Sequence, residues 1–155
     1  MLMDNDRSWS NLTLEEIQKF LESLRIRIPL LKERMEYEIA YGTARGADVK
    51  IKLWDGEQEH FLLLEVEQYS SGRLFFEKVK SWARRHSEHS NATTIVVSLL
   101  LPALYNRLTG DLSEKDDNIK EMVYSPSFRL FPGRGDGNMP DELREYLVGW
   151  IETRL

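Results

Sequence analysis

The chain has 155 residues, a formal net charge of −5 and no cysteine. This length fits one domain, because two separate cores would each be small for a stable fold. The absence of cysteine excludes a disulfide scaffold, a zinc or iron–sulfur site with Cys ligands, and a Cys nucleophile. Apolar residues make up 41% of the chain and charged residues 30%, a globular balance that excludes wholesale disorder.

The hydropathy of the sequence indicates whether to expect a signal peptide or a membrane span. The start, MLMDNDRSW, is acidic and lacks an apolar run, so we expect no signal peptide. The longest apolar stretch, residues 95–103, is interrupted and is shorter than the roughly 20 residues of a membrane span. We therefore expect an intracellular protein without a membrane partner, either cytoplasmic or nuclear.

The charge is unevenly distributed. Its negative sum disfavours a dedicated nucleic-acid binder, because contacts with phosphates need cations. Residues 73–89, however, hold five Lys or Arg residues against two Glu. This basic segment is either a solvated helix face or a strip beside a site that accepts an anionic ligand.

Residues 1–12 are expected to be a flexible N-terminus, and residues 13–155 to form a single domain. Thr13, with Glu16 three residues later, fits a capping box that opens an amphipathic helix. Apolar residues recur behind it at helical spacing, namely Leu14, Ile17, Leu21 and Leu24. Residues 30–38 are open between a second short helix and a strand, because EYEIAY alternates as a strand does.

The middle of the chain predicts three strands and a crossover helix. ADVKIKLW, residues 47–54, alternates apolar with polar residues and predicts a half-buried strand. An Asp-Gly turn starting at Asp55 leads into the apolar run HFLLLEVEQ, residues 60–68, typical of a central strand. TTIVVSLLL, residues 93–101, predicts a buried strand parallel to it, since a helix over residues 72–86 separates the two.

The last third of the chain predicts loops, an edge strand and a helix. Residues 106–118 predict a polar loop, and residues 123–131 predict a weaker strand that Pro126 places at a sheet edge. The RGD tripeptide at residues 134–136 is most simply a Gly-rich turn. Pro140 is expected at the first position of a final helix. The core face of that helix carries Leu143, Leu147 and Trp150.

Three acidic residues are placed to meet at one end of the predicted sheet. Asp48 stands at the head of one strand, and Glu65 and Glu67 stand near the end of the next, on one face of it. A hairpin brings these two strand ends together. Acids in a buried strand repel one another and lose hydration, so a cation has to meet them. A hard divalent ion, Mg²⁺ or Mn²⁺, suits such oxygens and suits metal-assisted phosphodiester hydrolysis.

This arrangement resembles the PD-(D/E)XK, or restriction-endonuclease-like, nuclease superfamily. GADVKI, a short hairpin, LLLEVEQ and a helix with a late Trp carry the resemblance, which covers about residues 13–101. Divergent nuclease-like proteins of plasmids and of fungi are the most similar, so a mobile element is one setting. The resemblance implies a single three-layer α/β domain with a helix, a three-strand meander, a crossover helix and a further strand. An edge strand and a C-terminal helix follow in this chain.

The resemblance also implies roles for residues of this chain. Asp48 and Glu65 match the acids of the motif and would be ligands of Mg²⁺ or Mn²⁺. Glu67 falls where the family usually has Lys, a departure that some restriction enzymes share. Gln68 would help to hold substrate or water. The resemblance implies Mg²⁺-dependent cleavage of DNA, and the missing Lys leaves open whether the chain is an active enzyme.

Two further roles have several candidates. A lysine that replaces the one of the motif would be Lys50, Lys78 or Lys80. The acid of the family's first helix would be Glu22, Glu33, Glu36 or Glu38. We prefer Glu38, because it is closest to the strands. The DNA backbone would be held by the basic helix through Arg73, Lys78, Lys80 and Arg84. A homodimer is compatible with the small size, since nucleases of this fold often cut two strands as pairs.

Two other interpretations stay open. The chain fits a non-catalytic descendant of the same fold that binds or assembles with other molecules, which the missing Lys and the net charge favour. It also fits a protein-interaction domain with structural carboxylates, in which Glu65 pairs with Arg45 or Arg73.

Single residues have plain alternatives as well. Asp48 after a glycine fits a turn cap, and Glu67 fits an exposed acid at a strand end. His60 is expected to be a residue at a strand edge rather than a ligand.

Overall fold

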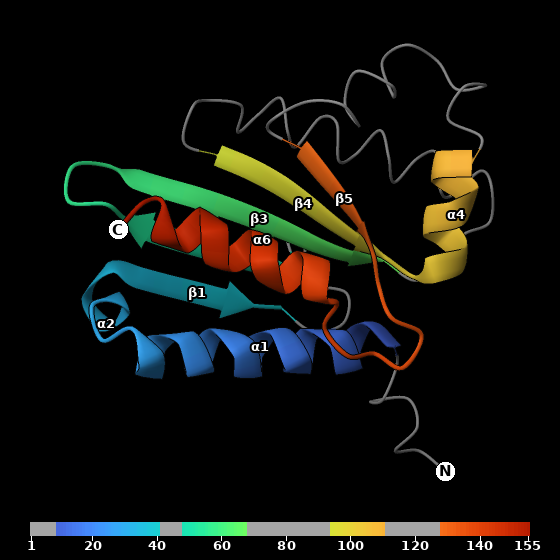
Figure 1. Cartoon of the computed structure of the whole chain (residues 1–155), viewed down its shortest axis with the longest axis horizontal. Coiled ribbons are helices and arrows are strands. Elements are labelled where there is room, and N and C mark those ends of the chain that lie inside the picture. Colours follow the sequence, from blue (N-terminus) through green and yellow to red (C-terminus); the bar gives the residue numbers. More distant parts are fainter. Residues whose placement is uncertain (1–8, 41–47, 68–93, 111–127) are drawn as a thin grey trace.

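The computed structural model describes residues 9–40, 48–67, 94–110 and 128–155. These residues form a mixed α/β fold on an open sheet of five strands, in the order β1-β2-β3-β4-β5 (Figure 1). The elements are α1 (Trp9–Arg27), α2 (Leu31–Arg34), β1 (Met35–Ile39), β2 (Val49–Trp54), β3 (Glu59–Glu67), β4 (Thr94–Leu100), α4 (Pro102–Gly110), β5 (Phe128–Pro132) and α6 (Asp141–Glu152). The crossover helix expected over residues 72–86, and the third layer it would form, lie outside the described ranges.

Helix α1 begins earlier than the capping pattern predicts. Thr13 lies inside the helix and its hydroxyl donates to the carbonyl of Trp9 at 2.9 Å, so it is not the N-cap and residues 9–12 are not part of a flexible terminus. The indole Nε1 of Trp9 donates to the carbonyl of Arg134 at 2.6 Å. A Cβ at position 133 would collide with the Trp9 ring, which explains Gly133. A contact with the far end of the chain therefore holds the start of α1.

Residues 30–38 contain both elements that the sequence leaves open. The single turn α2 ends at Arg34, and β1 starts at Met35. Strands β1, β2 and β3 then form an antiparallel meander, as predicted. In the β2–β3 turn the N–H of Asp55 donates to the carbonyl of Gln58 at 3.1 Å. Gly56 has φ +105°, a conformation that favours glycine, so the Asp-Gly turn is confirmed.

The second half of the sheet is parallel. β4 pairs with β3 and β5 pairs with β4, both in parallel, which confirms the predicted direction of β4 and the edge position of β5. The predicted loop over residues 106–118 is wrong for its first part, because α4 begins at Pro102 and continues to Gly110. Proline suits a first helical turn, where its missing N–H leaves no bond unmade.

The turn before α6 is tied together by its own side chains. The guanidinium of Arg134 binds the carboxylate of Asp136 at 2.9 Å, and the N–H of Asn138 donates to the same carboxylate at 2.9 Å. The RGD tripeptide is thus a Gly-rich turn, as expected. Pro140 is the N-cap of α6 rather than its first residue. The predicted core face of α6 is confirmed, since Leu143, Leu147 and Trp150 are buried.

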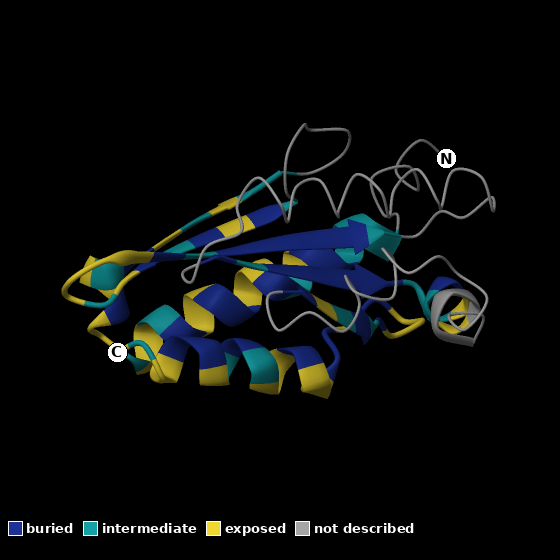
Figure 2. Cartoon of the chain, turned by 90° about the horizontal axis from the view of Figure 1, so that it is seen from above, coloured by how far each residue is buried: buried dark blue, intermediate teal, exposed yellow. Residues whose placement is uncertain are grey.

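The two faces of the sheet differ. One face packs against α1 and α6, which both lie on that side of the sheet (Figures 1 and 2). We call it the helix face; its sheet residues are Val49, Ile51, Leu53, Leu62, Leu64, Val66, Val97 and Leu99. The opposite face carries the alternate residues of the same strands, including Lys50, Lys52, Phe61, Leu63, Glu65, Val96 and Ser98. No helix in the described part of the chain is long and apolar enough to cross a membrane.

Candidate functional site

Asp48 lies directly before β2 and is bound to the end of β3. Its Oδ2 accepts a hydrogen bond from the backbone N–H of Val66 at 2.7 Å. Its own carbonyl accepts a bond of 2.8 Å from the N–H of Ala40, which continues the pairing of β1 with β2. Asp48 therefore sits across the ladder from β3, at the place where the sequence predicts that the two strand ends meet.

Glu65 stands opposite Asp48 on β3. Val49 pairs with Leu64, so one step further along the ladder brings Asp48 level with Glu65. Both side chains belong to the opposite face, because Leu64 and Val66 point to the helix face. Glu65 is only 8% exposed, which is unusual for a glutamate. Juxtaposition of these two acids is thus the part of the predicted site that the described residues bring together.

The position of Glu65 has a polar neighbour on its other side. Ser98 pairs with Glu65 across the parallel β3–β4 ladder and is fully buried. Its hydroxyl has no hydrogen-bond partner among the described residues. A buried hydroxyl without a partner is costly, so a polar group such as a water molecule is expected beside it. Asp48, Glu65 and Ser98 therefore form a polar row on the opposite face, from the start of β2 across β3 to β4.

The carboxylates of Asp48 and Glu65 suit a metal ion that keeps most of its own water ligands. Like charges side by side disfavour the doubly ionised state unless a cation or donors meet them. The part of the chain that the structure describes holds no cluster of three or more His, Cys, Asp or Glu residues around a common point. Mg²⁺ binds through one or two carboxylates and keeps several of its waters, so Asp48 and Glu65 fit such a hydrated ion.

The other predicted acids lie further away. Glu67 is the last residue of β3 and is partly exposed; its carbonyl accepts a bond of 3.0 Å from the N–H of Leu101. Glu38 is exposed on β1 and pairs with Lys50, two residue pairs along the ladder from Asp48. Glu67 shares the opposite face with Glu65, as the period of the strand predicts, and the pairing of Glu38 with Lys50 puts Glu38 on that face as well.

The three alternatives to Glu38 lie apart from the two acids. Glu22 accepts a hydrogen bond from the hydroxyl of Tyr37 and pairs with Arg25 at 3.3 Å on the far side of the sheet. Glu36 pairs with Lys52 at 3.2 Å, and Glu33 is exposed on α2. The remaining predicted site residues, Gln68, Arg73, Lys78, Lys80 and Arg84, lie outside the described residues.

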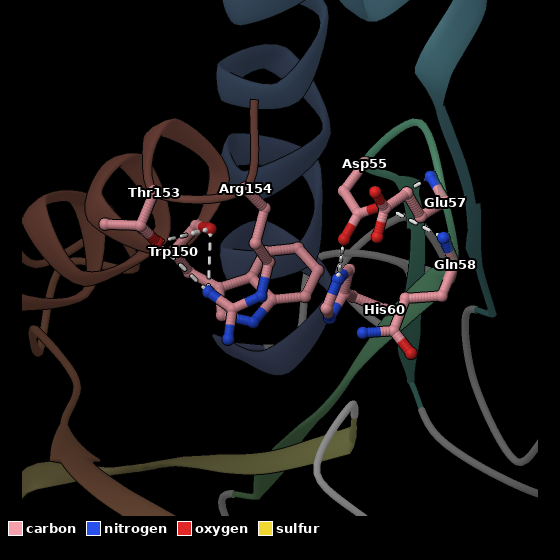
Figure 3. A network of polar contacts seen from close by, with 7 residues as sticks. All are labelled: Asp55, Glu57, Gln58, His60, Trp150, Thr153 and Arg154. Atoms are coloured by element: carbon pink, nitrogen blue, oxygen red, sulfur yellow. Dashed lines mark hydrogen bonds and ion pairs between the residues drawn. The ribbon is translucent and has the colours of Figure 1, made fainter.

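The structure contains a second polar network that the sequence does not predict. His60 is buried, and its Nε2 lies 2.7 Å from Oδ2 of Asp55 in the β2–β3 turn (Figure 3). The other oxygen of Asp55 accepts bonds from the N–H groups of Glu57 at 2.7 Å and Gln58 at 2.9 Å. The N–H of Gln58, then His60 and then the N–H of Glu57 lower the pKa of Asp55 to about 2. His60 is therefore a core residue tied to the turn, not a strand-edge residue.

The end of α6 lies against this turn (Figure 3). The guanidinium of Arg154 donates to the carbonyl of Trp150 at 3.0 Å and lies 5.1 Å from the centre of the Trp150 ring. Burial lowers the pKa of Arg154 below its ordinary value, and the charges of Tyr146 and Asp55 offset only part of this shift. The pairing of Asp55 with His60 at a spacing of five residues was the signal available in the sequence. Nothing local, however, indicates the approach of α6.

No protein family, curated protein or solved structure matches the chain.

Proposed function

We propose that this protein is a metal-dependent deoxyribonuclease whose site is formed by Asp48 and Glu65. The observation that carries the proposal is the bond from the N–H of Val66 to Asp48 Oδ2, which holds two carboxylates level across β2 and β3. Glu65 is an acid in a buried strand position, where a residue that serves only packing is usually apolar. Two acids arranged in this way suit a hard divalent cation and the hydrolysis of a phosphodiester.

The topology supports the restriction-endonuclease-like fold as the finer description. A helix precedes an antiparallel meander, and the next strand pairs in parallel with the last strand of the meander. These are the parts of the implied order that fall among the described residues, since the crossover helix expected over residues 72–86 lies outside them. The bond between Val66 and Asp48, at the end of β3 and the start of β2, supports this description as well.

The residues of the site would divide the work. A hydrated Mg²⁺ or Mn²⁺ would supply an activated water and would offset charge on the phosphate. Asp48 and Glu65 would hold that ion, with Asp48 oriented by the N–H of Val66. The water oxygen bonds to phosphorus, the bond to the leaving oxygen breaks, and solvent accepts one proton and supplies another. Glu67, Gln68 and Glu38 would assist at the margin of the site, and the basic segment would hold the DNA backbone.

A second candidate is a nuclease-fold module that binds without cleaving. Glu67 favours this second candidate, because an acid stands at the end of β3 where the resemblance implies a lysine. In that case Asp48 and Glu65 would bind an ion weakly, and the chain would act through its surface.

Calorimetric titration with Mn²⁺ separates these candidates. Wild type is expected to bind with a saturable signal that Glu65→Ala removes, because half of the ligand set is lost. Glu59→Ala is the matched control, since Glu59 is an exposed acid at the other end of the same strand. It should bind as wild type does. Saturable binding should be followed by cleavage of a DNA duplex in Mg²⁺. Cleavage that Glu65→Ala leaves unchanged would refute the proposal, and binding without any cleavage would favour the second candidate.

A further inference from the structure

A hollow lies at the closed end of the β2–β3 hairpin, where the end of α6 meets the turn (Figure 3). Its volume of about 500 Å³ lies within the range of pockets that bind small organic molecules. We call it the turn pocket; its lining residues are Asp55, Glu57, His60, Thr153, Arg154 and Leu155. The turn pocket is separate from the proposed metal site, because Asp48 and Glu65 stand at the open end of the same hairpin.

Arg154 brings a positive charge to the turn pocket and forms no ion pair with a residue in the described part of the chain. The hydrogen bonds of its side chain start from Nη1, at 3.0 Å to the carbonyl of Trp150 and at 3.1 Å to the hydroxyl of Thr153. Its Nε is buried and has no hydrogen-bond partner there. A guanidinium binds an oxyanion most firmly through two parallel N–H bonds. The edge of the Arg154 guanidinium that contains Nε is therefore a donor edge without an acceptor among the described residues.

His60 is the second group of the turn pocket with an unused nitrogen. Its side chain is only 10% exposed, and its Nδ1 is buried without a hydrogen-bond partner among the described residues. The other ring nitrogen, Nε2, lies 2.7 Å from Oδ2 of Asp55, so Nε2 donates its proton to that carboxylate. A buried polar atom without a partner costs free energy. A further polar group is therefore expected beside Nδ1 of His60.

The Arg154 side chain can move toward a ligand in the turn pocket. Its guanidinium lies 5.1 Å from the centre of the Trp150 ring, and the residue stands just beyond the last residue of α6. A cation–π contact at a partly exposed position is weak, so an anion in the hollow can draw the guanidinium off the ring. Because His60 lines the same hollow, a single anion there can meet both the Nε edge of Arg154 and Nδ1 of His60.

We propose that the turn pocket binds a phosphate monoester, whose phosphate is held by the Nε edge of Arg154 and by Nδ1 of His60. This inference does not depend on the proposed function. A phosphate monoester has three free oxygens, two for the guanidinium edge and one for the ring. Its second pKa of about 6 lets that last oxygen donate to Nδ1 when the ring is neutral and accept from Nδ1 when the ring is protonated. The rest of the hollow receives the organic part of the ligand.

The two acids of the turn pocket differ in their effect on an anion. Asp55 already accepts two backbone N–H groups and contacts His60, so its negative charge is met within the turn. Glu57 is an exposed acid of the same lining, and its charge opposes an anion in the hollow. Removal of the Glu57 charge should therefore strengthen binding, whereas removal of the Arg154 charge should weaken it. These opposite signs distinguish a phosphate site from a general loss of structure.

Methyl phosphate is the probe, titrated at constant ionic strength without divalent metal, so that the proposed metal site takes no part. NMR shifts of the His60 ring and of the Glu57 amide should follow one saturable binding curve. Arg154→Gln should weaken binding by about tenfold or more, because charge-assisted bonds to the phosphate are lost. Arg144→Gln is the matched control; this arginine of α6 lies 5.3 Å from the Phe20 ring and does not line the pocket. Glu57→Gln should tighten binding a few-fold.

Three outcomes would overturn the inference. If methyl phosphate gives no saturable shift, water alone meets Nδ1 of His60 and Nε of Arg154. If Arg144→Gln weakens binding as much as Arg154→Gln does, the phosphate is attracted by general charge rather than by a site. If acetate binds as tightly as methyl phosphate, the pocket takes any small anion; acetate should instead bind about tenfold more weakly, because it lacks the third oxygen.

Two larger ligands identify the source of the phosphate group. A nucleoside 5′-monophosphate represents a free small molecule, and a short DNA strand with a 5′-phosphate represents the end of a nucleic acid. Tighter binding of either than of methyl phosphate supports the inference and assigns the source. Binding of the DNA strand that is unchanged when its 5′-phosphate is removed, together with no binding of the nucleotide, would overturn it.

Discussion

The β2–β3 hairpin carries acidic residues at both of its ends, and the surroundings of these acids differ between the two ends. At the turn, Asp55 receives two backbone N–H groups and contacts His60, all within five residues of chain. At the open end, Asp48 is level with Glu65, an acid that belongs to the other strand. The turn thus holds one acid with donors from its own few residues, whereas the open end brings together two acids from different strands.

This difference distinguishes an acid that its own turn explains from a pair of acids that the sheet brings together. Asp55 needs nothing beyond its neighbours, and the donors around it explain its low pKa. The register of the sheet, rather than local sequence, brings Asp48 and Glu65 together. Such a pair is expected where a cation or a substrate completes the site. Substitutions at the two ends should therefore have opposite profiles in activity and in stability.

The largest effect should follow from one substitution made at each end. Asp48→Asn removes the charge of a proposed metal ligand while keeping an oxygen that accepts from the N–H of Val66. Loss of a ligand exceeds the effect of losing an outer partner, so DNA cleavage should fall by more than about 100-fold. Asp55→Asn changes the same chemical group at the turn and should leave cleavage within a factor of about two, as its network does not touch the proposed site. Initial rates on one DNA duplex in Mg²⁺ give both values.

Equal loss of cleavage in Asp48→Asn and Asp55→Asn would remove the distinction between the two ends. A thermal unfolding scan of each variant is the control, because an unfolded fraction would mimic a loss of rate. Asp48→Asn should unfold cooperatively, as wild type does.

The second prediction concerns stability at the turn. His60→Ala removes a buried ring and leaves Asp55 without its side-chain partner. The free energy of unfolding should fall by about 1–3 kcal/mol, and the Tm by about 2–4 °C for each kcal/mol in a chain of this size. Glu57→Ala is the control, since its exposed side chain is removed while its backbone N–H still donates to Asp55. Chemical denaturation should show no loss for Glu57→Ala beyond about 0.5 kcal/mol. Similar values for both variants would show that the His60 contact adds nothing to the fold.

The sequence predicts the open end better than the turn, for a physical reason. Period two and one hairpin suffice to place Asp48 beside Glu65, because a strand ladder converts sequence spacing directly into position. His60 looks like a strand-edge residue, since its burial depends on α6, which approaches from the far end of the chain. The predicted start of α1 was wrong for the same reason, because Trp9 is hydrogen-bonded to Arg134, 125 residues away. Contacts between distant segments leave no periodic signal, so the meander and its acids were predictable, and these two contacts were not.

The smallest predicted effect is a dependence of the turn on acid. The donors around Asp55 lower its folded pKa to about 2, below its ordinary value near 3.8, so ionised Asp55 stabilises the folded state. A lowered folded pKa gives stability that is complete above the unfolded pKa and is lost as the pH falls through the folded pKa. Wild type should therefore exceed Asp55→Asn in stability by a constant amount from pH 5 to about pH 4, and the excess should shrink between about pH 4 and pH 2. Urea unfolding of both proteins over this range measures this difference. Asp136, whose pKa Arg134 lowers to about 2, titrates in the same window but is common to both proteins, so it cancels in the difference. An excess that stays constant down to pH 2 would mean that the charge of Asp55 does not support the turn, and the contrast between the two ends of the hairpin would then rest on the open end alone.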